Sequence, residues 1–221
     1  MVTIRRSVKY PEETDSYRIG QRPKVRVSIA DYGVGNLHSI RKALELAGAR
    51  PVIESNMRNL LDAEVIVFPG VGAFDSAMEK LLPYKDIIAD RLNAGTPCLG
   101  ICIGAQILFE GSEEGSRPGL GFMKGRVVRL KAQRVPHMGW NEVRSQSKEF
   151  AGVPSPYFYF AHSYHGVPAE DVTIATTDYY GDFPSAFRKK NVIGVQFHPE
   201  KSSLSGGAFL NNFVKFIEAK L

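Results

Sequence analysis

The segment CLGICIGAQILF, residues 98–109, changes character at Cys102, and this change decides the fold. The residues before Cys102 are apolar, as in a short buried strand, whereas those after it have the composition of a helix. Gly100 and Gly104 flank the cysteine and leave room for a sharp turn between strand and helix. On such a turn the cysteine is lifted out of the sheet and can act as a nucleophile. Alternatively, Cys102 is a small buried side chain that only fills space, as free cysteines often do.

The segments before residue 98 alternate between strand-like and helix-like patterns. Asn36 can cap the first of the helices, and Gly48 can end it. This alternation predicts a parallel sheet with helices on both faces. The expected strands are residues 25–30, 50–54, 65–70 and 97–102, and the expected helices are residues 37–47, 73–82, 84–92 and 103–111.

The pattern changes after Gly111, where short strand-like stretches follow one another with few helical ones. We therefore predict an α/β fold, with an open, mostly parallel sheet flanked by helices and an added antiparallel portion of short strands. Residues 25–221 are expected to form one domain, and the polar residues 1–24 a loosely ordered N-terminal extension. The later strands are expected at residues 125–130, 157–161, 172–177 and 192–197, followed by an amphipathic helix over 206–221.

The composition is that of an ordinary globular protein. Hydrophobic residues make up 43% of the 221 residues and charged residues 23%, which argues against wholesale disorder. No apolar run approaches the roughly 20 residues of a membrane span, and residues 1–24 lack the apolar core of a signal peptide, so a cytoplasmic location is expected. Cys98 and Cys102 are too far apart for a disulfide in an extended segment and too few for a metal site. We expect reduced thiols, no metal and no cofactor.

A basic run, KGRVVRLKAQR at residues 124–134, accounts for much of the excess of 28 Lys and Arg over 23 Asp and Glu. This excess raises the alternative of nucleic-acid binding. No zinc-finger, helix-turn-helix or RNA-recognition signature accompanies the run, however. Its alternation with Val and Leu favours a strand with a solvated or partner-facing surface, and we expect no nucleic-acid or membrane partner.

A second chemical pattern is GVQFHPEKSS, where Glu200 follows His198 across a proline. In an extended stretch, residues two apart point the same way, so the carboxylate can orient the imidazole as it does in nucleophile–base–acid triads. Both Cys102 and His198 come at the carboxyl ends of expected strands, where open α/β sheets place their sites. The alternative is a polar loop after a strand. The glycines of FPGVGAF and the amide of Ile103 can supply donors to an oxyanion, although FPGVGAF can equally be a loop without a catalytic role.

GICIGAQ, PGVGAF and GVQFHPEKS together resemble the class I glutamine amidotransferases, whose triad is Cys, His and Glu. DYGVGNLHSI, PHMGWNEV and YFYFAHSYHG are similar to the glutaminase subunits of imidazole glycerol phosphate synthases, which act in histidine biosynthesis. The resemblance runs in order from about residue 25 to the C-terminus. It implies L-glutamine as the substrate and a cyclase subunit with a (βα)8-barrel fold as the partner in a heterodimer that receives the ammonia.

The resemblance also implies roles for particular residues. Cys102 is the nucleophile, His198 the general base and acid, and Glu200 its orienting group. The residues implied to form the oxyanion site and to bind glutamine are Gly70, Val71, Gly72, Ile103, Gln106, Ser163 and Tyr164. The residues implied to face the partner subunit are Asn36, Trp140, Tyr159 and Lys201.

Two positions of the turn depart from the family, which more often has Leu and Met where this chain has Ile103 and Ala105. The smaller Ala105 is expected to loosen the glutamine pocket slightly. Two other functions stay open. The chain could be the glutaminase subunit of another synthase, of the anthranilate or GMP type, or a non-catalytic partner module that keeps the fold.

Overall fold

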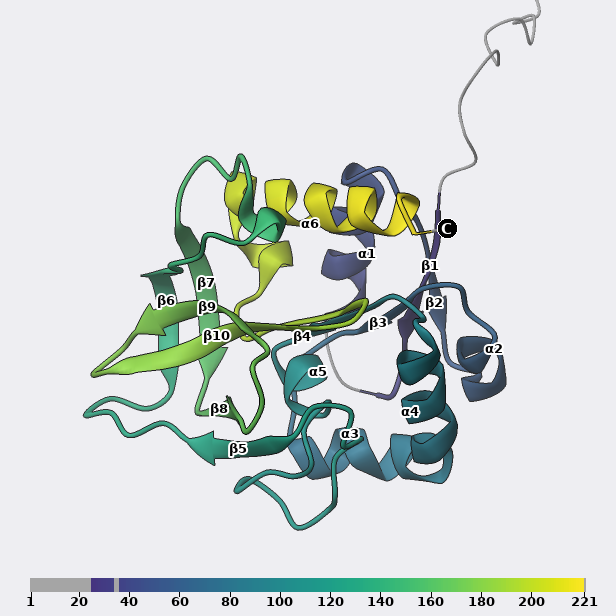
Figure 1. The fold of residues 1–221 in the computed structure, drawn as a ribbon, viewed down its shortest axis with the longest axis horizontal. Helices are drawn as coiled ribbons and strands as arrows, with labels where there is room; N and C mark the ends of the chain where they lie inside the picture. The colour runs from purple at the N-terminus through teal and green to yellow at the C-terminus, as the bar shows by residue number, and fades with distance from the viewer. Residues whose placement is uncertain (1–24, 34–35, 221) are drawn as a thin grey trace, which may run out of the picture.

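A mixed sheet of seven strands runs through the computed structural model, which describes residues 25–33 and 36–220 (Figure 1). The predicted extension, residues 1–24, lies outside this range. The strand order is β2-β1-β3-β4-β11-β10-β9. The first five strands are parallel, whereas β10 is antiparallel to both of its neighbours, β11 and the edge strand β9. This arrangement is the one expected for the predicted fold class. The strands are β1 (Arg26–Ala30), β2 (Arg50–Glu54), β3 (Ile66–Phe68), β4 (Cys98–Ile101), β9 (Thr173–Asp178), β10 (Asp182–Lys189) and β11 (Val192–Val195).

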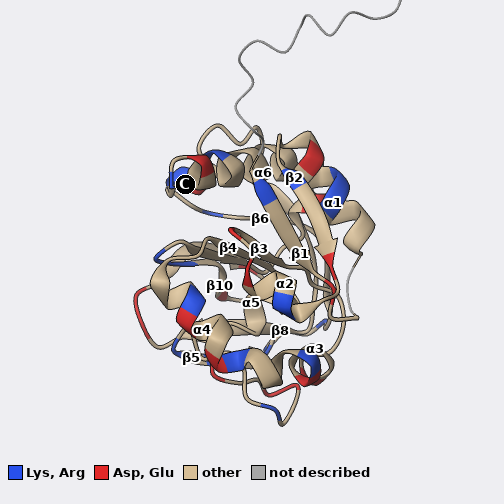
Figure 2. Cartoon of the chain, turned by 90° about the vertical axis from the view of Figure 1, so that its right-hand side faces the viewer, with Lys and Arg blue, Asp and Glu red and all other residues tan. Residues whose placement is uncertain are grey.

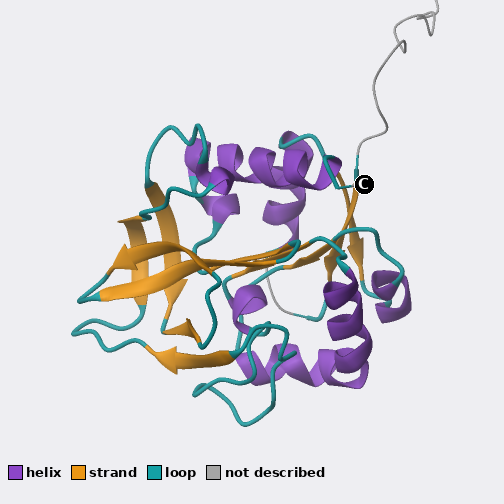
Figure 3. Cartoon of the chain, in the orientation of Figure 1, coloured by secondary structure: helices purple, strands orange, loops and turns teal. Residues whose placement is uncertain are grey.

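Helices cover both faces of this sheet, with α1 and α6 on one face and α3, α4 and α5 on the other (Figure 3). The cap predicted for the first helix is confirmed, because the Asn36 side chain accepts a hydrogen bond from the Ser39 amide at 3.2 Å. The helices are α1 (Leu37–Leu46), α2 (Met57–Leu61), α3 (Phe74–Leu81), α4 (Lys85–Ala94), α5 (Ile103–Gln106) and α6 (Ser203–Glu218), with 3-10 turns η1 (Leu82–Tyr84), η2 (Lys148–Phe150) and η3 (Pro199–Lys201).

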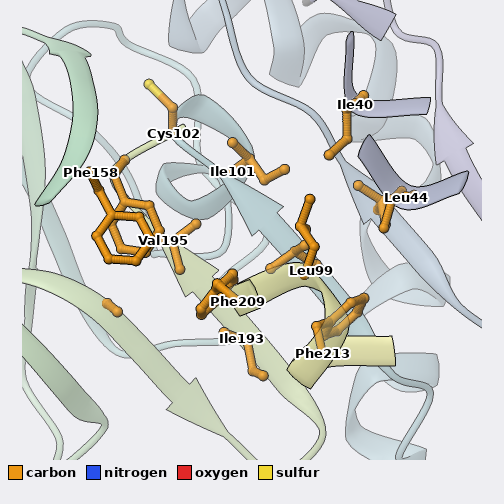
Figure 4. Close-up of a cluster of buried hydrophobic side chains, with 14 of the residues drawn as sticks. Ile40, Leu44, Leu99, Ile101, Cys102, Phe158, Ile193, Val195, Phe209 and Phe213 are labelled. Carbon is orange, nitrogen blue, oxygen red and sulfur yellow. The ribbon is translucent and has the colours of Figure 1, made fainter. Parts of the chain in front are cut away.

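The buried side chains form two clusters, one on each face of the sheet. Neighbouring residues of a strand go to opposite clusters, so Leu99 packs with α1 and α6 whereas Cys98 packs with α3 and α4. Figure 4 shows the first cluster, in which Phe209 and Phe213 of α6 lie over β4 and β11. The sulfur of Cys102 lies at the margin of that cluster. This packing holds β4 and β11 in place, and the candidate site is built at their carboxyl ends.

Two small antiparallel sheets complete the fold. β5 (Gly125–Arg129) pairs with β8 (Tyr164–Pro168), and β6 (His137–Glu142) pairs with β7 (Tyr157–His162). The sequence patterns missed β6, β8, β10 and the five-residue helix α2. β10 carries Pro184 beside a register irregularity, which breaks the strand pattern, and α2 is too short to show a helical period. The predicted helix after Cys102 is also shorter than expected, because α5 ends at Gln106.

The charged residues are mixed rather than separated. On the face shown in Figure 2, basic and acidic segments alternate along α1, α3 and α4. The basic run is bordered by acidic groups, since Glu170 accepts a hydrogen bond from the Lys124 amide and Glu113 accepts one from the Arg129 amide. In the described part of the chain, no helix has the length and apolar character needed to cross a membrane.

Candidate active site

Three segments leave the central sheet at the same edge. β3, β4 and β11 are adjacent and parallel, and the chain continues from their carboxyl ends to Gly70, Cys102 and His198. The prediction that the cysteine and the histidine converge at a sheet edge is therefore confirmed. Open α/β sheets bind ligands at this edge because their loops gather there.

The turn at Cys102 has the backbone geometry expected of a nucleophile between a strand and a helix, although the side chain is only 3% exposed. Its φ of 51° and ψ of −108° lie in a region that residues other than glycine rarely adopt, and such strain is typical of functional positions. The flanking glycines are required by space. A Cβ atom on Gly100 would lie 2.4 Å from the carbonyl oxygen of Gly104, and one on Gly104 would lie 1.9 Å from the carbonyl oxygen of Phe68. A cysteine that only filled the core would need neither feature.

His198 and Glu200 form a buried pair. Nδ1 of His198 lies 2.8 Å from Oε1 of Glu200, and the two side chains are 1% and 7% exposed. The carboxylate accepts the Nδ1 proton, so Nε2 is free for the thiol; it makes no regular hydrogen bond with another described residue. Burial lowers the pKa of His198, but the neighbouring sulfur of Cys102 and the carboxylate of Glu200 outweigh burial and raise it to about 10.

This electrostatic coupling can be measured. Cys102→Ala and Glu200→Gln each remove one group that raises the pKa of His198, so both variants should show a pKa below the value of about 10. The measurement is an NMR titration of the histidine ring nitrogens in the labelled protein. A pKa that stays unchanged in Cys102→Ala would contradict the electrostatic coupling between the imidazole and the sulfur.

The same coupling predicts how stability depends on pH. The pKa of His198 is higher in the folded chain than its ordinary 6.5, so the protonated ring stabilises the folded state fully below pH 6.5. That contribution disappears as the pH rises toward about 10. Across this window, the free energy of unfolding should therefore fall more steeply for the wild-type chain than for Glu200→Gln, which removes a group that raises this pKa and adds no titrating group.

A cavity of about 330 Å³ opens beside Cys102, at the small end of the range for ligand pockets. Its walls are formed by the turn at residues 100–104, here called the elbow, by the segment after β3 and by the turn between β7 and β8. Six residues expected at the oxyanion and glutamine sites line it together with Cys102: Val71, Gly72, Ile103, Gln106, Ser163 and Tyr164. Five further lining residues were not predicted, namely Glu114, Pro136, Met138, Ala161 and His162.

Gly70 and Ala105 are not among the residues that line the cavity. A Cβ atom on Gly70 would be 2.6 Å from the amide nitrogen of Ile103, so the segment after β3 touches the backbone of the elbow. This contact places Gly70 beside the amide expected to bind an oxyanion. Ala105 faces β11, where a Cβ on Gly194 would lie 3.2 Å from its own Cβ. The small side chain of Ala105 thus fits against the sheet.

Sequence reasoning missed Gln196, whose side chain contacts the sulfur of Cys102. Nε2 of Gln196 lies 3.5 Å from Sγ of Cys102, and its Oε1 accepts a hydrogen bond from Nε2 of Gln106 at 3.1 Å. Nε2 of Gln106 also donates to the carbonyl oxygen of Tyr164 at 2.8 Å. The sequence offered no local signal for this residue, because the burial of Gln196 and its polar partners are apparent only in the folded chain.

Three of the four residues expected to face a partner form one exposed group, here called the Trp140 cluster (Trp140, Tyr159 and Lys201). The ring of Trp140, which is 53% exposed, meets the edge of Tyr159 at 6.3 Å between centroids. Nζ of Lys201 lies 5.8 Å from the centroid of the Tyr159 ring. The fourth residue, Asn36, lies at the start of α1, where it caps the helix.

The comparisons with known proteins agree on one family. Residues 28–216 match the family described as glutamine amidotransferase class-I. The imidazole glycerol phosphate synthase subunit HisH of Thermococcus kodakarensis is 48% identical over 196 residues, which cover 85% of this chain and 98% of the relative. The subunit of the same name from Pyrococcus furiosus is 48% identical over 194 residues, covering 85% of this chain and 97% of the relative.

The fold is also found among solved structures. One described as a glutamine amidotransferase has a TM-score of 0.71 to this chain at 20% identity. The match covers 87% of this chain and 98% of that structure. At this identity the likeness is one of fold.

Proposed function

The chain belongs to the class I glutamine amidotransferases, and we propose that it is the glutaminase subunit of an imidazole glycerol phosphate synthase in histidine biosynthesis, with residues 25–221 as its catalytic domain. The proposal is carried by one observation, the strained Cys102 beside the buried His198–Glu200 pair at the mouth of a small cavity. The relatives that bear this subunit name match over nearly their whole length, which supports the choice among synthases.

In the proposed reaction, the thiolate of Cys102 attacks the γ-carboxamide carbon of glutamine. The amide of Ile103 and the backbone of residues 70–72 donate hydrogen bonds to the oxygen that becomes negative. His198 gives a proton to the departing ammonia, and a thioester with Cys102 remains. His198 then takes a proton from water, which attacks the thioester and releases glutamate. Glu200 holds the ring of His198 in the tautomer that these transfers need.

The cavity supplies the binding site in this proposal. Gln106 and the segment of Ser163 and Tyr164 hold the amino-acid end of glutamine, and the cavity volume of about 330 Å³ suits a small polar molecule. Cys102 is one of the residues that line this cavity, so the carboxamide of a bound glutamine would reach its sulfur. No cofactor takes part in these steps.

The ammonia is proposed to pass to a cyclase subunit with a (βα)8-barrel fold. That subunit joins it to a phosphorylated ribulosyl aminoimidazole carboxamide nucleotide and forms imidazole glycerol phosphate and an aminoimidazole carboxamide ribonucleotide. The Trp140 cluster is the proposed docking surface, because it joins an exposed aromatic anchor to a cation. Met138 and Tyr157, which are 64% and 51% exposed on the same two strands, extend its apolar area.

The test is the release of glutamate from glutamine, measured for the chain alone and with the cyclase subunit and its nucleotide. We expect the complex to be at least about tenfold faster, which corresponds to an activation free energy lower by about 1.4 kcal/mol. Equal rates in both states would overturn the proposed partner. Stimulation by an anthranilate or GMP synthase subunit instead would identify a different synthase.

The docking surface is tested in the same assay with Trp140→Ala. Loss of an aromatic side chain that becomes buried on binding costs about 2 kcal/mol of binding free energy. The cyclase subunit should therefore bind roughly 30-fold more weakly. Tyr180→Ala is the matched control, because Tyr180 is equally exposed at 53% but lies in the turn between β9 and β10. Equal affinities of the two variants would place the interface elsewhere.

A further inference from the structure

Two buried histidines beside the cavity have no part in the proposed chemistry. His137 on β6 and His162 on β7 stand opposite each other in the antiparallel pair, and their side chains are 2% and 5% exposed. Nδ1 of His137 lies 3.0 Å from Nε2 of His162. A hydrogen bond joins the two rings, and its direction can be worked out from the groups at either end.

One end of this chain of contacts is a carbonyl group. Nδ1 of His162 lies 2.9 Å from the carbonyl oxygen of Tyr164, which can only accept, so the proton of His162 is on Nδ1. Nε2 of a neutral His162 is then an acceptor. The proton between the two rings must therefore be on Nδ1 of His137, and Nε2 of His137 must accept as well.

The contacts at the other end, at Asn141, independently give the same direction for the hydrogen bonds. Nδ2 of Asn141 lies 3.2 Å from Nε2 of His137. The orientation of this amide is set by the backbone, because Nδ2 also donates to the carbonyl oxygen of Asp178 at 2.9 Å and Oδ1 accepts from the amide of Glu142 at 2.7 Å. Asn141 therefore donates to His137, which donates to His162, which donates to Tyr164.

Both rings are neutral, as this order of donors requires. Burial lowers the pKa of His137 to about 4 and that of His162 to about 3. Aromatic rings enclose His137, which stacks on Phe160 at 4.6 Å and on Tyr179 at 3.9 Å between centroids. At neutral pH each ring thus has one proton and one fixed tautomer.

The chain of donors ends at the wall of the cavity. The carbonyl of Tyr164 accepts from Nδ1 of His162 and from Nε2 of Gln106, and all three residues line the cavity. His137 and Asn141 do not line it, and their hydrogen bonds connect them to it through His162.

We propose that Asn141, His137 and His162 form a one-directional hydrogen-bond relay that positions the carbonyl of Tyr164 and, through it, the wall of the glutamine site. His137 is thus a positioning residue rather than a catalytic residue. The inference rests on the proposed function in one respect, that the ligand of the cavity is glutamine. The direction of the hydrogen bonds stands independently of that ligand.

Two substitutions at His137 separate this role from simple packing. His137→Asn places an amide nitrogen close to the position of Nδ1, so it keeps the donor to His162 but loses the stacked ring. His137→Phe keeps the stacked ring but loses the donor. Steady-state kinetics are measured for both, with saturating cyclase subunit and nucleotide, and thermal unfolding confirms that each variant is folded.

If the relay positions the glutamine site, His137→Phe should raise the KM for glutamine by about fivefold or more with kcat within about twofold, whereas His137→Asn should stay close to wild type. A fivefold change corresponds to about 1 kcal/mol, the usual size of one hydrogen bond. If His137 only packs, the order is reversed, because Asn removes the ring and Phe keeps it. A KM in His137→Asn equal to or above that in His137→Phe would overturn the proposal.

A second readout does not depend on activity. The NMR shifts of the ring nitrogens in the labelled chain should show wild-type His162 protonated on Nδ1 and His137 protonated on Nδ1. Protonation of either ring on Nε2 instead would overturn the relay. A wild-type protein that shows these tautomers without hydrolysing glutamine would contradict the proposed function and leave the direction of the relay intact.

Discussion

Replacing Cys102 with alanine is expected to lower the rate of glutamine hydrolysis by about 10⁴-fold or more, the usual effect of removing the nucleophile of a triad. The reason is geometric. Within the elbow, Sγ of Cys102 is the only group that can attack a carbonyl. The turn that carries it is tight, and only glycine fits on either side. Glutamine should still bind, because the other lining residues of the cavity are unchanged.

The chain contains its own control for this experiment. Cys98 lies four residues earlier in β4 and is fully buried, and burial raises the pKa of its thiol, so it does not form a reactive thiolate. Cys98→Ala should therefore keep turnover within a few-fold of wild type. Glutamate release and glutamine binding by calorimetry are measured for both variants. Activity of Cys102→Ala above about one hundredth of wild type would contradict the assignment of the nucleophile.

Gly104→Ala is expected to lower kcat by about 100-fold, because a displacement of about 1 Å at a reacting group has effects of this order. A Cβ atom at this position would lie 1.9 Å from the carbonyl oxygen of Phe68, and this neighbour is backbone that cannot rotate away. The start of α5 must move from β3 and carry Cys102 with it. The same crowding should lower the free energy of unfolding by about 1–3 kcal/mol.

Gly207→Ala is the matched control for this helix substitution. Gly207 lies in α6, and a Cβ atom there would meet nothing within 4 Å. Since alanine favours a helix over glycine, this variant should gain about 0.5–1 kcal/mol of stability and keep full activity. Urea unfolding and glutaminase kinetics measure both effects. Normal stability and turnover of Gly104→Ala would mean that the elbow can accommodate a Cβ atom for which the structure leaves no room.

Much of the central sheet and of the candidate site could be predicted from local pattern. The glycine spacing around Cys102 implied a turn, and the contacts at Gly100 and Gly104 show why only glycine fits there. The spacing of His198 and Glu200 implied a pair of side chains on one side of an extended stretch, which the 2.8 Å contact bears out. Both inferences use residues within a few positions of each other, where backbone geometry limits the outcomes.

Other features had no local signal. In β6 the polar His137 is buried whereas the apolar Met138 and Trp140 are exposed, the reverse of the usual strand pattern, so the strand had no clear signal. β10 was not recognised as a strand because Pro184 interrupts its pattern. The buried Gln196 reads as an ordinary polar residue next to a strand until its partner, 90 positions earlier in the chain, is known. In each case the stabilising contacts come from a distant segment.

The alternation of strands and helices up to Cys102, apart from α2, thus follows from the sequence, as do the elbow and the His198–Glu200 pair. Each depends on hydrophobic period, glycine spacing or the geometry of a short extended stretch. The tertiary structure alone decides which residues share the cavity and in which direction the protons of His137 and His162 point. The physical reason is that a buried donor must find an acceptor, and for these side chains the acceptors lie on other strands whose pairing is set by the packing of the whole domain.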